Sequence, residues 1–402
     1  MEFPEFDIND YNYFLPDKNI AQFPAKNRGE SNILLAHKNP FSIARFNELK
    51  HFIPRDSLLI FNETKVIPAR LIFYKPSGAR IEIFLLNPEN NTDFQLALAS
   101  TVSCSWNVLI GNASKWKNGD LLIKIENSKN SFVTLTASRT GADTVKFKWD
   151  SDISFSEILS LVAKIPLPPY IQRENIEEDR IRYQTVFARN EGSVAAPTAG
   201  LHFTESQLQE LAENGIIKAS ITLHVGLGTF RPVKGSISEH KMHTEPFYIA
   251  DEQLNILSQN ANKPWVVVGT TTLRALESLY IYAEKIKMGI SEPKNSFEIQ
   301  QWDKRQIKNE MPRNEAFSIL MQIANQNQMG LYGQTSLFIA KGNAIKTADY
   351  LITNFHQPKS TLLMLVDAFA SEKWQTAYEY AINNNMRFLS YGDACLFKNI
   401  AL

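Results

Sequence analysis

The chain has 402 residues, of which 44% are hydrophobic and 25 are Phe, so it can bury substantial cores. Its 42 Lys and Arg balance 42 Asp and Glu. Because this balance excludes a global positive field, any nucleic-acid partner must be bound by a local basic patch. The length predicts about two to three domains.

Cysteine use and targeting signals favour a cytoplasmic protein without a membrane partner. Cys104 and Cys395 lie far apart and fit neither a disulfide framework nor a paired-cysteine metal site. The acidic start, MEFPEFDIND, lacks the basic and apolar regions of a signal peptide. The longest apolar run, near 362–370, contains Asp367 and is too short to span a bilayer.

Residues 1–70 read as a lead-in of short elements. Apolar runs predict strands at 33–35 and 57–61, with a helix over 42–52 between them. Asn62 then suits a turn, and Pro68 prevents a central strand. Arg70 is either a solvated surface charge or an anion ligand.

Residues 71–150 are rich in short strands separated by turn clusters. Strands are expected at 71–74, 80–86, 94–99, 106–110, 120–125, 132–137 and 144–149. Even spacing without intervening helices is typical of a small barrel or sandwich. We therefore predict a β-barrel domain over 71–150, inserted into a larger domain.

The larger domain, 1–70 with 151–402, is predicted to be α/β because helices and strands alternate. Residues 284–330 are polar and are expected to form a solvated helical excursion. The expected helices are 154–164, 204–214, 251–262, 272–287, 361–371 and 373–383. The expected strands are 217–225, 247–249, 265–268, 336–339 and 350–352.

The stretch GSVAAPTAGLHFT (192–204) carries chemical interest. Gly200 allows close backbone approach, and Thr198 and His202 precede a helix that Thr204 caps. A loop with few side chains beside a helix N-terminus suits a polar or anionic ligand group. A tight structural loop with His202 satisfied in the core explains the pattern equally well.

Four further polar clusters follow apolar strands, at 224–232, 240–245, 269–278 and 353–361. In an open α/β sheet, ligands collect beyond the carboxyl ends of the strands, so we expect these loops to converge on one pocket. The spacing of His240, His243 and Glu245 is not diagnostic of a metal site, and no metal is predicted. Residues 269–272 either bind an anion at a helix N-terminus or simply cap the helix.

Ordered motifs across nearly the whole chain resemble the S-adenosylmethionine:tRNA ribosyltransferase-isomerase family. They are FNETKVIPARL (61–71), YQTVFA (183–188), GSVAAPTAGLHFT (192–204), LHVGLGTFRPV (223–233), HKMHTE (240–245), GTTTLRALES (269–278), TNFHQPKSTLLMLVDAFA (353–370) and FLSYGDACLF (388–397). The resemblance implies an α/β domain with a small antiparallel β-barrel. It also implies transfer and isomerisation of the ribosyl part of S-adenosylmethionine onto 7-aminomethyl-7-deazaguanine in tRNA, giving epoxyqueuosine, adenine and methionine.

Such chemistry needs a base for a proton beside a sulfonium and a proton donor for adenine. His202 is the first candidate, and His243 and His356 lie in similar motifs and are expected to titrate near neutrality. Glu245 is a lesser candidate. S-adenosylmethionine would be a co-substrate, with no cofactor.

The remaining candidates would bind substrate. The resemblance assigns Thr198, Thr229, Thr271 and Asn354 to the ribose hydroxyls and the adenine edge. Arg70 and Arg274 would bind the methionine carboxylate or a tRNA phosphate. The other substrate-binding candidates are Asn62, Tyr183 and Gly200.

Two alternatives remain open at this point. Gly333–Asn343 departs from the family pattern, which leaves room for a paralogue that uses S-adenosylmethionine on a different acceptor. A catalytically silent RNA-binding relative is the other alternative. RNA binding would need a basic stripe on the barrel, for which the candidates are Lys115, Lys117, Arg139, Lys146 and Lys148.

Overall fold

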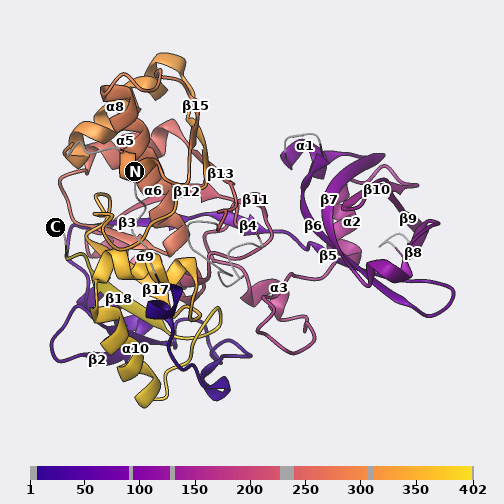
Figure 1. The fold of residues 1–402 in the computed structure, drawn as a ribbon, viewed down its shortest axis with the longest axis horizontal. Coiled ribbons are helices and arrows are strands. Elements are labelled where there is room, and N and C mark those ends of the chain that lie inside the picture. The colour runs from indigo at the N-terminus through magenta and orange to yellow at the C-terminus, as the bar shows by residue number, and fades with distance from the viewer. Residues whose placement is uncertain (1–6, 90–93, 127–131, 227–239, 307–310, 401–402) are drawn as a thin grey trace.

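Two sheets of unequal size dominate the structure, a computed structural model that describes residues 7–89, 94–126, 132–226, 240–306 and 311–400. Figure 1 shows them side by side: the larger sheet carries most of the helices, and the smaller stands apart. The first and last described segments of the chain lie on the side of the larger sheet.

The larger sheet has ten strands in the order β15-β16-β13-β12-β3-β14-β17-β18-β1-β2. Its four central neighbours, β12, β3, β14 and β17, all run parallel. The strands are β1 (Asn32–Leu35), β2 (Ser42–Arg45), β3 (Leu58–Asn62), β12 (Ile217–Leu223), β13 (Glu245–Ile249), β14 (Trp265–Val268), β15 (Ser296–Ile299), β16 (Leu331–Thr335), β17 (Tyr350–Asn354) and β18 (Ala394–Lys398).

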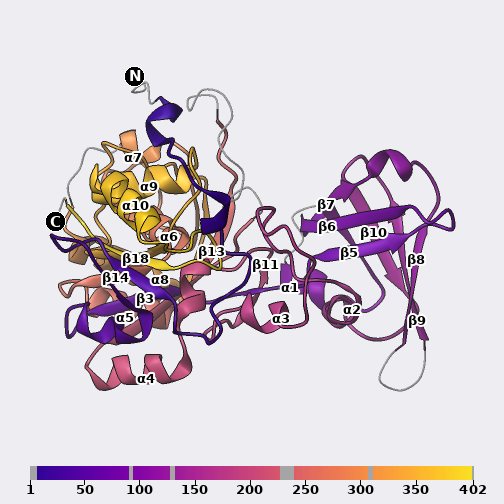
Figure 2. The ribbon, with the colours of Figure 1, turned by 90° about the horizontal axis from the view of Figure 1, so that it is seen from below.

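Helices cover both faces of this sheet, which is why its central strands read as continuous apolar runs. Along β3, Leu58 and Ile60 join one core and Leu59 and Phe61 join another. In Figure 2, α4 lies on one side of the sheet and α9 and α10 lie on the other. The helices of this part are α3 (Asp179–Arg182), α4 (Glu205–Glu213), α5 (Asp251–Gln259), α6 (Thr270–Lys287), α7 (Asp303–Gln306), α8 (Arg313–Asn327), α9 (Thr361–Ala370) and α10 (Lys373–Asn383).

The smaller sheet has six strands, all antiparallel, in the order β5-β6-β7-β10-β9-β8. Its edge strands β5 and β8 also approach each other, so the sheet is nearly closed into a barrel. A core of its own fills the interior, built around Trp106, Trp116 and Phe147. The elements are β5 (Arg70–Tyr74), β6 (Arg80–Pro88), α1 (Phe94–Ala99), β7 (Ser103–Gly111), β8 (Leu121–Glu126), β9 (Phe132–Arg139), β10 (Thr144–Trp149) and α2 (Phe155–Val162).

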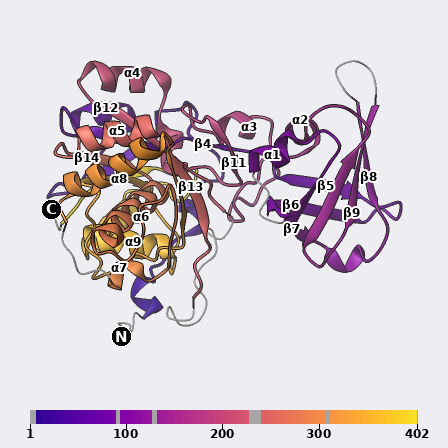
Figure 3. The same cartoon turned by 90° about the horizontal axis from the view of Figure 1, so that it is seen from above.

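The chain passes between the two sheets at one narrow place, visible in Figure 3 between β4 and β5. There Arg70 and Lys164 form an isolated antiparallel bridge, with N···O distances of 3.2 and 2.8 Å. A two-stranded parallel sheet of β4 (Thr64–Val66) and β11 (Asn190–Ser193) lies beside this crossing. The boundaries predicted for two domains stay a prediction, but the mixed sheet and the separate barrel-like sheet are as expected.

Three expected elements are wrong. Residues 94–99 form helix α1, because Phe94, Ala97 and Leu98, spaced i, i+3 and i+4, face the small core. The expected helix over 42–52 is strand β2 followed by a 3-10 helix (Phe46–His51). No strand forms at 336–339: β16 ends at Thr335, whose hydroxyl accepts the Leu337 N–H at 3.1 Å.

The polar stretch 284–330 is also more ordered than expected. Strand β15 lies inside it and pairs with β16, which follows it, and α8 buries Phe317 and Leu320 against the main core. Its polar residues therefore cover only one side of α8. Within the described ranges, every helix is too short or too polar to cross a membrane.

Candidate active site

A cavity of about 60 Å³ opens beyond the carboxyl ends of the parallel strands β14 and β17. As predicted for an open α/β sheet, loops that are distant in sequence meet there. Four of the candidate residues line it: Thr198, Thr271, Asn354 and His356. Its wall also holds the hydroxyl residues Thr270, Thr353, Ser360 and Ser390.

Residues 192–204 shape one wall of this cavity. Thr198–His202 form a 3-10 helix that places Thr198 on the cavity. A Cβ at Gly200 would lie 2.6 Å from Phe187 Cζ and 2.9 Å from Thr185 Cγ2. Gly200 is therefore required for packing and does not line the cavity.

His202 lies beside the cavity and is only 5% exposed. Its Nδ1 is 2.7 Å from Ser31 Oγ, and its Nε2 is 3.2 Å from Asn354 Nδ2. With the Asn354 amide donating to Nε2, the imidazole proton lies on Nδ1 and donates to Ser31. Burial, with the charges of Arg387 and Arg28 second, lowers the His202 pKa to about 3.

His356 is the second histidine at the site. Its Nε2 is 2.9 Å from Thr353 Oγ1, and its backbone N–H donates to the Tyr378 hydroxyl. Burial lowers its pKa to about 3 as well. Both imidazoles are therefore neutral at pH 7, and the expectation that they titrate near neutrality is wrong for these two.

The N-terminus of α6 faces the cavity through Thr270 and Thr271. The preceding Gly269 has φ +90° and ψ 145°, a conformation open essentially to glycine alone. The N-cap residue is this glycine, so it offers no side chain to cap the helix. The first-turn amides of α6 thus remain available to an acceptor or anion on a ligand.

Asn354 presents a second unused group to the same space. Its side-chain oxygen is buried and has no hydrogen-bond partner among the described residues. A buried acceptor of this kind is costly unless a donor reaches it. A hydroxyl or amino group on a bound ligand would supply that donor.

Comparison with known proteins places the chain in a family. The model of the queuosine biosynthesis protein family matches residues 8–397. The chain belongs to this family. Proteins named S-adenosylmethionine:tRNA ribosyltransferase-isomerase are 37% identical in Halothermothrix orenii and 38% identical in a Sulfurihydrogenibium species, each covering 97% of this chain and 99% of the relative.

Two further matches span similar lengths. The protein of that name from Geotalea uraniireducens is 36% identical over 96% of this chain and 98% of its own. A crystal structure of S-adenosylmethionine tRNA ribosyltransferase from Thermotoga maritima matches 96% of this chain and 99% of its own, with 26% identity and a TM-score of 0.45.

Several residues that the family motifs suggested lie away from the cavity. Arg70 forms a two-pronged ion pair with Glu82, with N···O distances of 2.6 and 3.1 Å. Asn62 bonds backbone groups of Thr64 and Leu223 and so ties β3 to β12. Neither residue lines the cavity, and the substrate-binding roles expected for them stay predictions.

Arg274 and Glu245 are paired with each other, both in the interior. Their ion pair joins α6 to β13, and Glu245 also accepts the Gly226 N–H at 3.4 Å. Burial lowers the Arg274 pKa to about 10, which still leaves it charged at neutral pH. The pairing gives Arg274 a contact within the scaffold, and the carboxylate-binding role expected for it stays a prediction.

The remaining candidates are dispersed. Tyr183 is fully buried, and its ring packs edge-on against Tyr391. His243 is exposed, outside the cavity wall. Thr229 lies outside the described residues. Within the described part of the chain, no three His, Cys, Asp or Glu side chains gather as metal ligands would.

Sequence reasoning missed a second, smaller cavity on the other side of His202. It is lined by Arg28, Arg182, Arg387 and Ser31 and meets the first cavity at Ser390. These arginines are far apart in sequence, so no motif spacing relates them. Arg182 and Arg387 directly precede the 183–188 and 388–397 motifs, but Arg28 lies next to none of the motifs.

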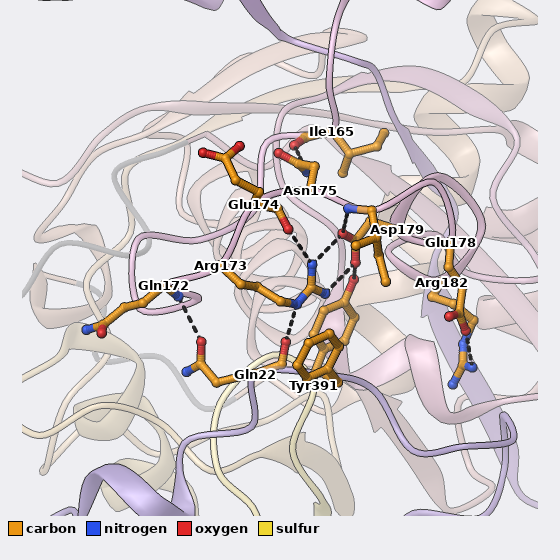
Figure 4. Close-up of polar contacts among 12 residues, drawn as sticks. Gln22, Ile165, Gln172, Arg173, Glu174, Asn175, Glu178, Asp179, Arg182 and Tyr391 are labelled. Atoms are coloured by element: carbon orange, nitrogen blue, oxygen red, sulfur yellow. Dashed lines mark hydrogen bonds and ion pairs between the residues drawn. The ribbon is translucent and has the colours of Figure 1, made fainter.

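A rigid ion pair backs this second cavity. Two nitrogens of Arg173 donate to the Asp179 carboxylate, both at 2.7 Å, and the Tyr391 hydroxyl donates to the same carboxylate at 2.8 Å. Figure 4 shows these three residues together. Tyr391 lines the cavity, so this network fixes part of its wall. Arg182 lies nearby and bonds Glu178 at 3.0 Å.

Proposed function

We propose that this protein transfers and isomerises the ribosyl moiety of S-adenosylmethionine onto 7-aminomethyl-7-deazaguanine in tRNA, releasing adenine and methionine and leaving epoxyqueuosine. The observation that carries the proposal is one cavity that unites the motif loops 196–199, 269–271 and 353–357. Relatives that carry this activity in their names match nearly the whole chain. We also expect a cytoplasmic location, where tRNA is found.

The side chains that line the cavity suit the polar groups of a ribose and an adenine ring. Thr198, Thr271 and Asn354 offer hydroxyl and amide groups to the sugar hydroxyls and to the adenine edge. The uncapped N-terminus of α6 offers N–H donors to an oxygen or nitrogen acceptor. These roles require no cofactor, because S-adenosylmethionine itself supplies the reacting group.

His202 is the proposed base for the proton beside the sulfonium. Its neutral imidazole holds a lone pair on Nε2, which Asn354 occupies until a ligand displaces that contact. Ser31 accepts the Nδ1 proton and keeps the ring oriented. Burial lowers its basicity, so a negative group on the bound substrate must offset the charge that it gains.

The names of the relatives favour this activity over a paralogue with another acceptor and over a catalytically silent RNA-binding protein. Retention of His202, Thr198 and Asn354 around one cavity also argues against silence.

The test is a product assay. Purified protein is incubated with S-adenosylmethionine and tRNA carrying 7-aminomethyl-7-deazaguanine, and adenine and modified nucleosides are measured by mass spectrometry. Both adenine and epoxyqueuosine should form, with or without a metal chelator. The control tRNA carries guanine at the same position and should stay unmodified. Adenine release without epoxyqueuosine would contradict the proposed acceptor, and loss of product with chelator would contradict the expected absence of a metal.

A further inference from the structure

The small cavity beside His202 is unusually rich in positive charge. Arg28, Arg182 and Arg387 all line a space of about 20 Å³, together with His202 and Ser31. These side chains lie close enough together that some of them lower the pKa of a neighbour. Arg28 and Arg387 both lower the pKa of His202, and Arg182 lowers that of Arg28.

The negative charges around this cavity do not balance the arginines. Arg182 pairs with Glu178 at 3.0 Å, and Arg387 lies 3.5 Å from Asp393. Asp179 is already taken by Arg173. No carboxylate among the described residues lies within 4.0 Å of the Arg28 guanidinium, so one positive charge is left over.

Arg28 is instead bonded to three backbone carbonyls. It donates to Gln184 at 2.7 Å, Ile181 at 2.8 Å and Leu201 at 3.3 Å. Carbonyl dipoles hold the guanidinium in place but do not neutralise it. A half-buried charge that is rigidly held and lacks a counter-ion is prepared to receive an anion.

We propose that Arg28, Arg182 and Arg387 form the subsite for the carboxylate of the methionine moiety of S-adenosylmethionine. This inference rests on the proposed function, and it replaces the role that the sequence suggested for Arg70 and Arg274. The sulfonium would lie near His202, between the two cavities that share Ser390.

The dimensions favour a carboxylate over a tRNA phosphate. A cavity of 20 Å³ holds roughly one or two water-sized groups, which matches the two oxygens of a carboxylate. A phosphate in an RNA strand brings a ribose on each side. The position next to a histidine that is only 5% exposed also suits the end of a small molecule.

Binding measurements with two ligands test the subsite. Decarboxylated S-adenosylmethionine keeps the adenosine, the sulfonium and the amine but lacks the carboxylate. Dissociation constants for both ligands are measured by calorimetry on wild type, Arg28→Gln and Arg387→Gln. Wild type should prefer S-adenosylmethionine by about 10- to 100-fold, the scale of a charge-assisted bond, and each variant should reduce this ratio toward one.

A matched control uses Arg313→Gln. Arg313 likewise donates to two carbonyls, of Ala261 and Lys263, and pairs with Asp349, but it lies outside both cavities. The ratio of the two dissociation constants in Arg313→Gln should equal that of wild type. Because both ligands are compared on the same protein, the ratio is insensitive to a partly unfolded sample. Arg387, at 33% exposed, gives a second variant if Arg28→Gln does not fold.

Three outcomes overturn the inference. A wild-type ratio near one excludes a carboxylate subsite. An unchanged ratio in Arg28→Gln and Arg387→Gln places the carboxylate elsewhere, and a loss of tRNA affinity in those variants would then assign the cluster to a phosphate. If wild type binds no S-adenosylmethionine and releases no adenine, the proposed function is overturned as well. If wild type turns over but binds both ligands equally well, only the subsite is overturned.

Discussion

His202 sits between an uncharged cavity and a positively charged one, and this position governs its chemistry. Burial and two arginines keep its imidazole neutral. A carboxylate bound at Arg28 and Arg387 would cancel part of that effect and raise the pKa of His202. Substrate binding would then strengthen the base only when the sulfonium is in place.

Replacement of His202 tests its role directly. His202→Ala should lower kcat by about 10²- to 10⁴-fold, the usual contribution of a positioned acid or base. The affinity for S-adenosylmethionine should change much less, because the variant keeps Asn354 and the arginines. Single-turnover adenine release measures both quantities. His51→Ala, at an exposed position on the 3-10 helix Phe46–His51, is the control, and full turnover by His202→Ala would remove His202 as the base.

The two buried histidines also predict how stability depends on pH. Each has a pKa of about 3 in the folded protein, below the ordinary 6.5. Between these values the unfolded chain binds more protons, so the stability present above pH 6.5 is lost as the pH falls toward 3. The loss is up to about 1.4 kcal/mol per pH unit for each histidine.

Urea unfolding at pH 6.5 and pH 5 measures this effect. Between these pH values, the free energy of unfolding of His356→Gln should fall by up to about 2 kcal/mol less than that of wild type. Carboxylates titrate in both proteins, so their contribution cancels in the comparison. Equal pH dependence in the two proteins would show that the pKa of His356 does not differ between the folded and unfolded states.

At the scale of elements, the start of α6 depends on one glycine. Gly269 has φ +90°, and Gly289, just beyond the other end of the helix, has φ +70°. Alanine at either position should lower the free energy of unfolding by about 1–3 kcal/mol, because both conformations disfavour a Cβ. Only Gly269→Ala should also weaken S-adenosylmethionine binding, since it shifts the first-turn amides.

Thermal unfolding and calorimetric titration of the two variants separate these effects. Gly289→Ala is the matched control, because a Cβ there meets no atom within 4 Å and the site is distant. Equal binding by both variants would mean that the α6 N-terminus does not contact the ligand.

Elements with clear periodicity could be predicted from the sequence, and those decided by packing could not. The buried strand β14 and the long helix α6 were predicted almost to the residue. FQLALA (94–99) was mistaken for a strand because so short an apolar run fits either period. The strand expected at 336–339 is apolar but lies beyond the last ladder partner of β16.

The site shows the same division. Thr198, Thr271 and Asn354 follow strands or precede helices, so the rule for open sheets placed them together. Arg70 and Arg274 looked identical to ligand-binding arginines because a sequence does not show that Glu82 and Glu245 pair with them. Arg28 and Arg387 were missed because only the folded chain brings them together.

For the whole molecule, separate cores predict separable unfolding. Phe147 belongs to the core of the six-stranded sheet and Phe317 to that of the mixed sheet. Either Phe→Ala change should cost about 3–5 kcal/mol. If the predicted domains fold independently, two unfolding transitions are expected. Phe147→Ala should lower the midpoint temperature of only the transition that S-adenosylmethionine does not stabilise. Phe317→Ala should lower the midpoint temperature of only the transition that S-adenosylmethionine stabilises.

Scanning calorimetry with and without S-adenosylmethionine checks this prediction. The two variants serve as controls for each other, since they remove the same side chain from buried positions. A single transition that both changes lower equally would mean that the two sheets unfold as one cooperative unit.

The backbone bridge between Arg70 and Lys164 holds together the two points at which the chain enters and leaves the small sheet. The chain leaves the larger part of the molecule at Arg70 and returns to it at Lys164, which is hydrogen-bonded to Arg70. The residues between them therefore do not change the distance that the rest of the chain has to cover. The number of residues between Arg70 and Lys164 therefore does not affect the spacing of β3, β14 and β17. Insertions or deletions in the strands of the small sheet should therefore leave the dimensions of the cavity beside His202 unchanged.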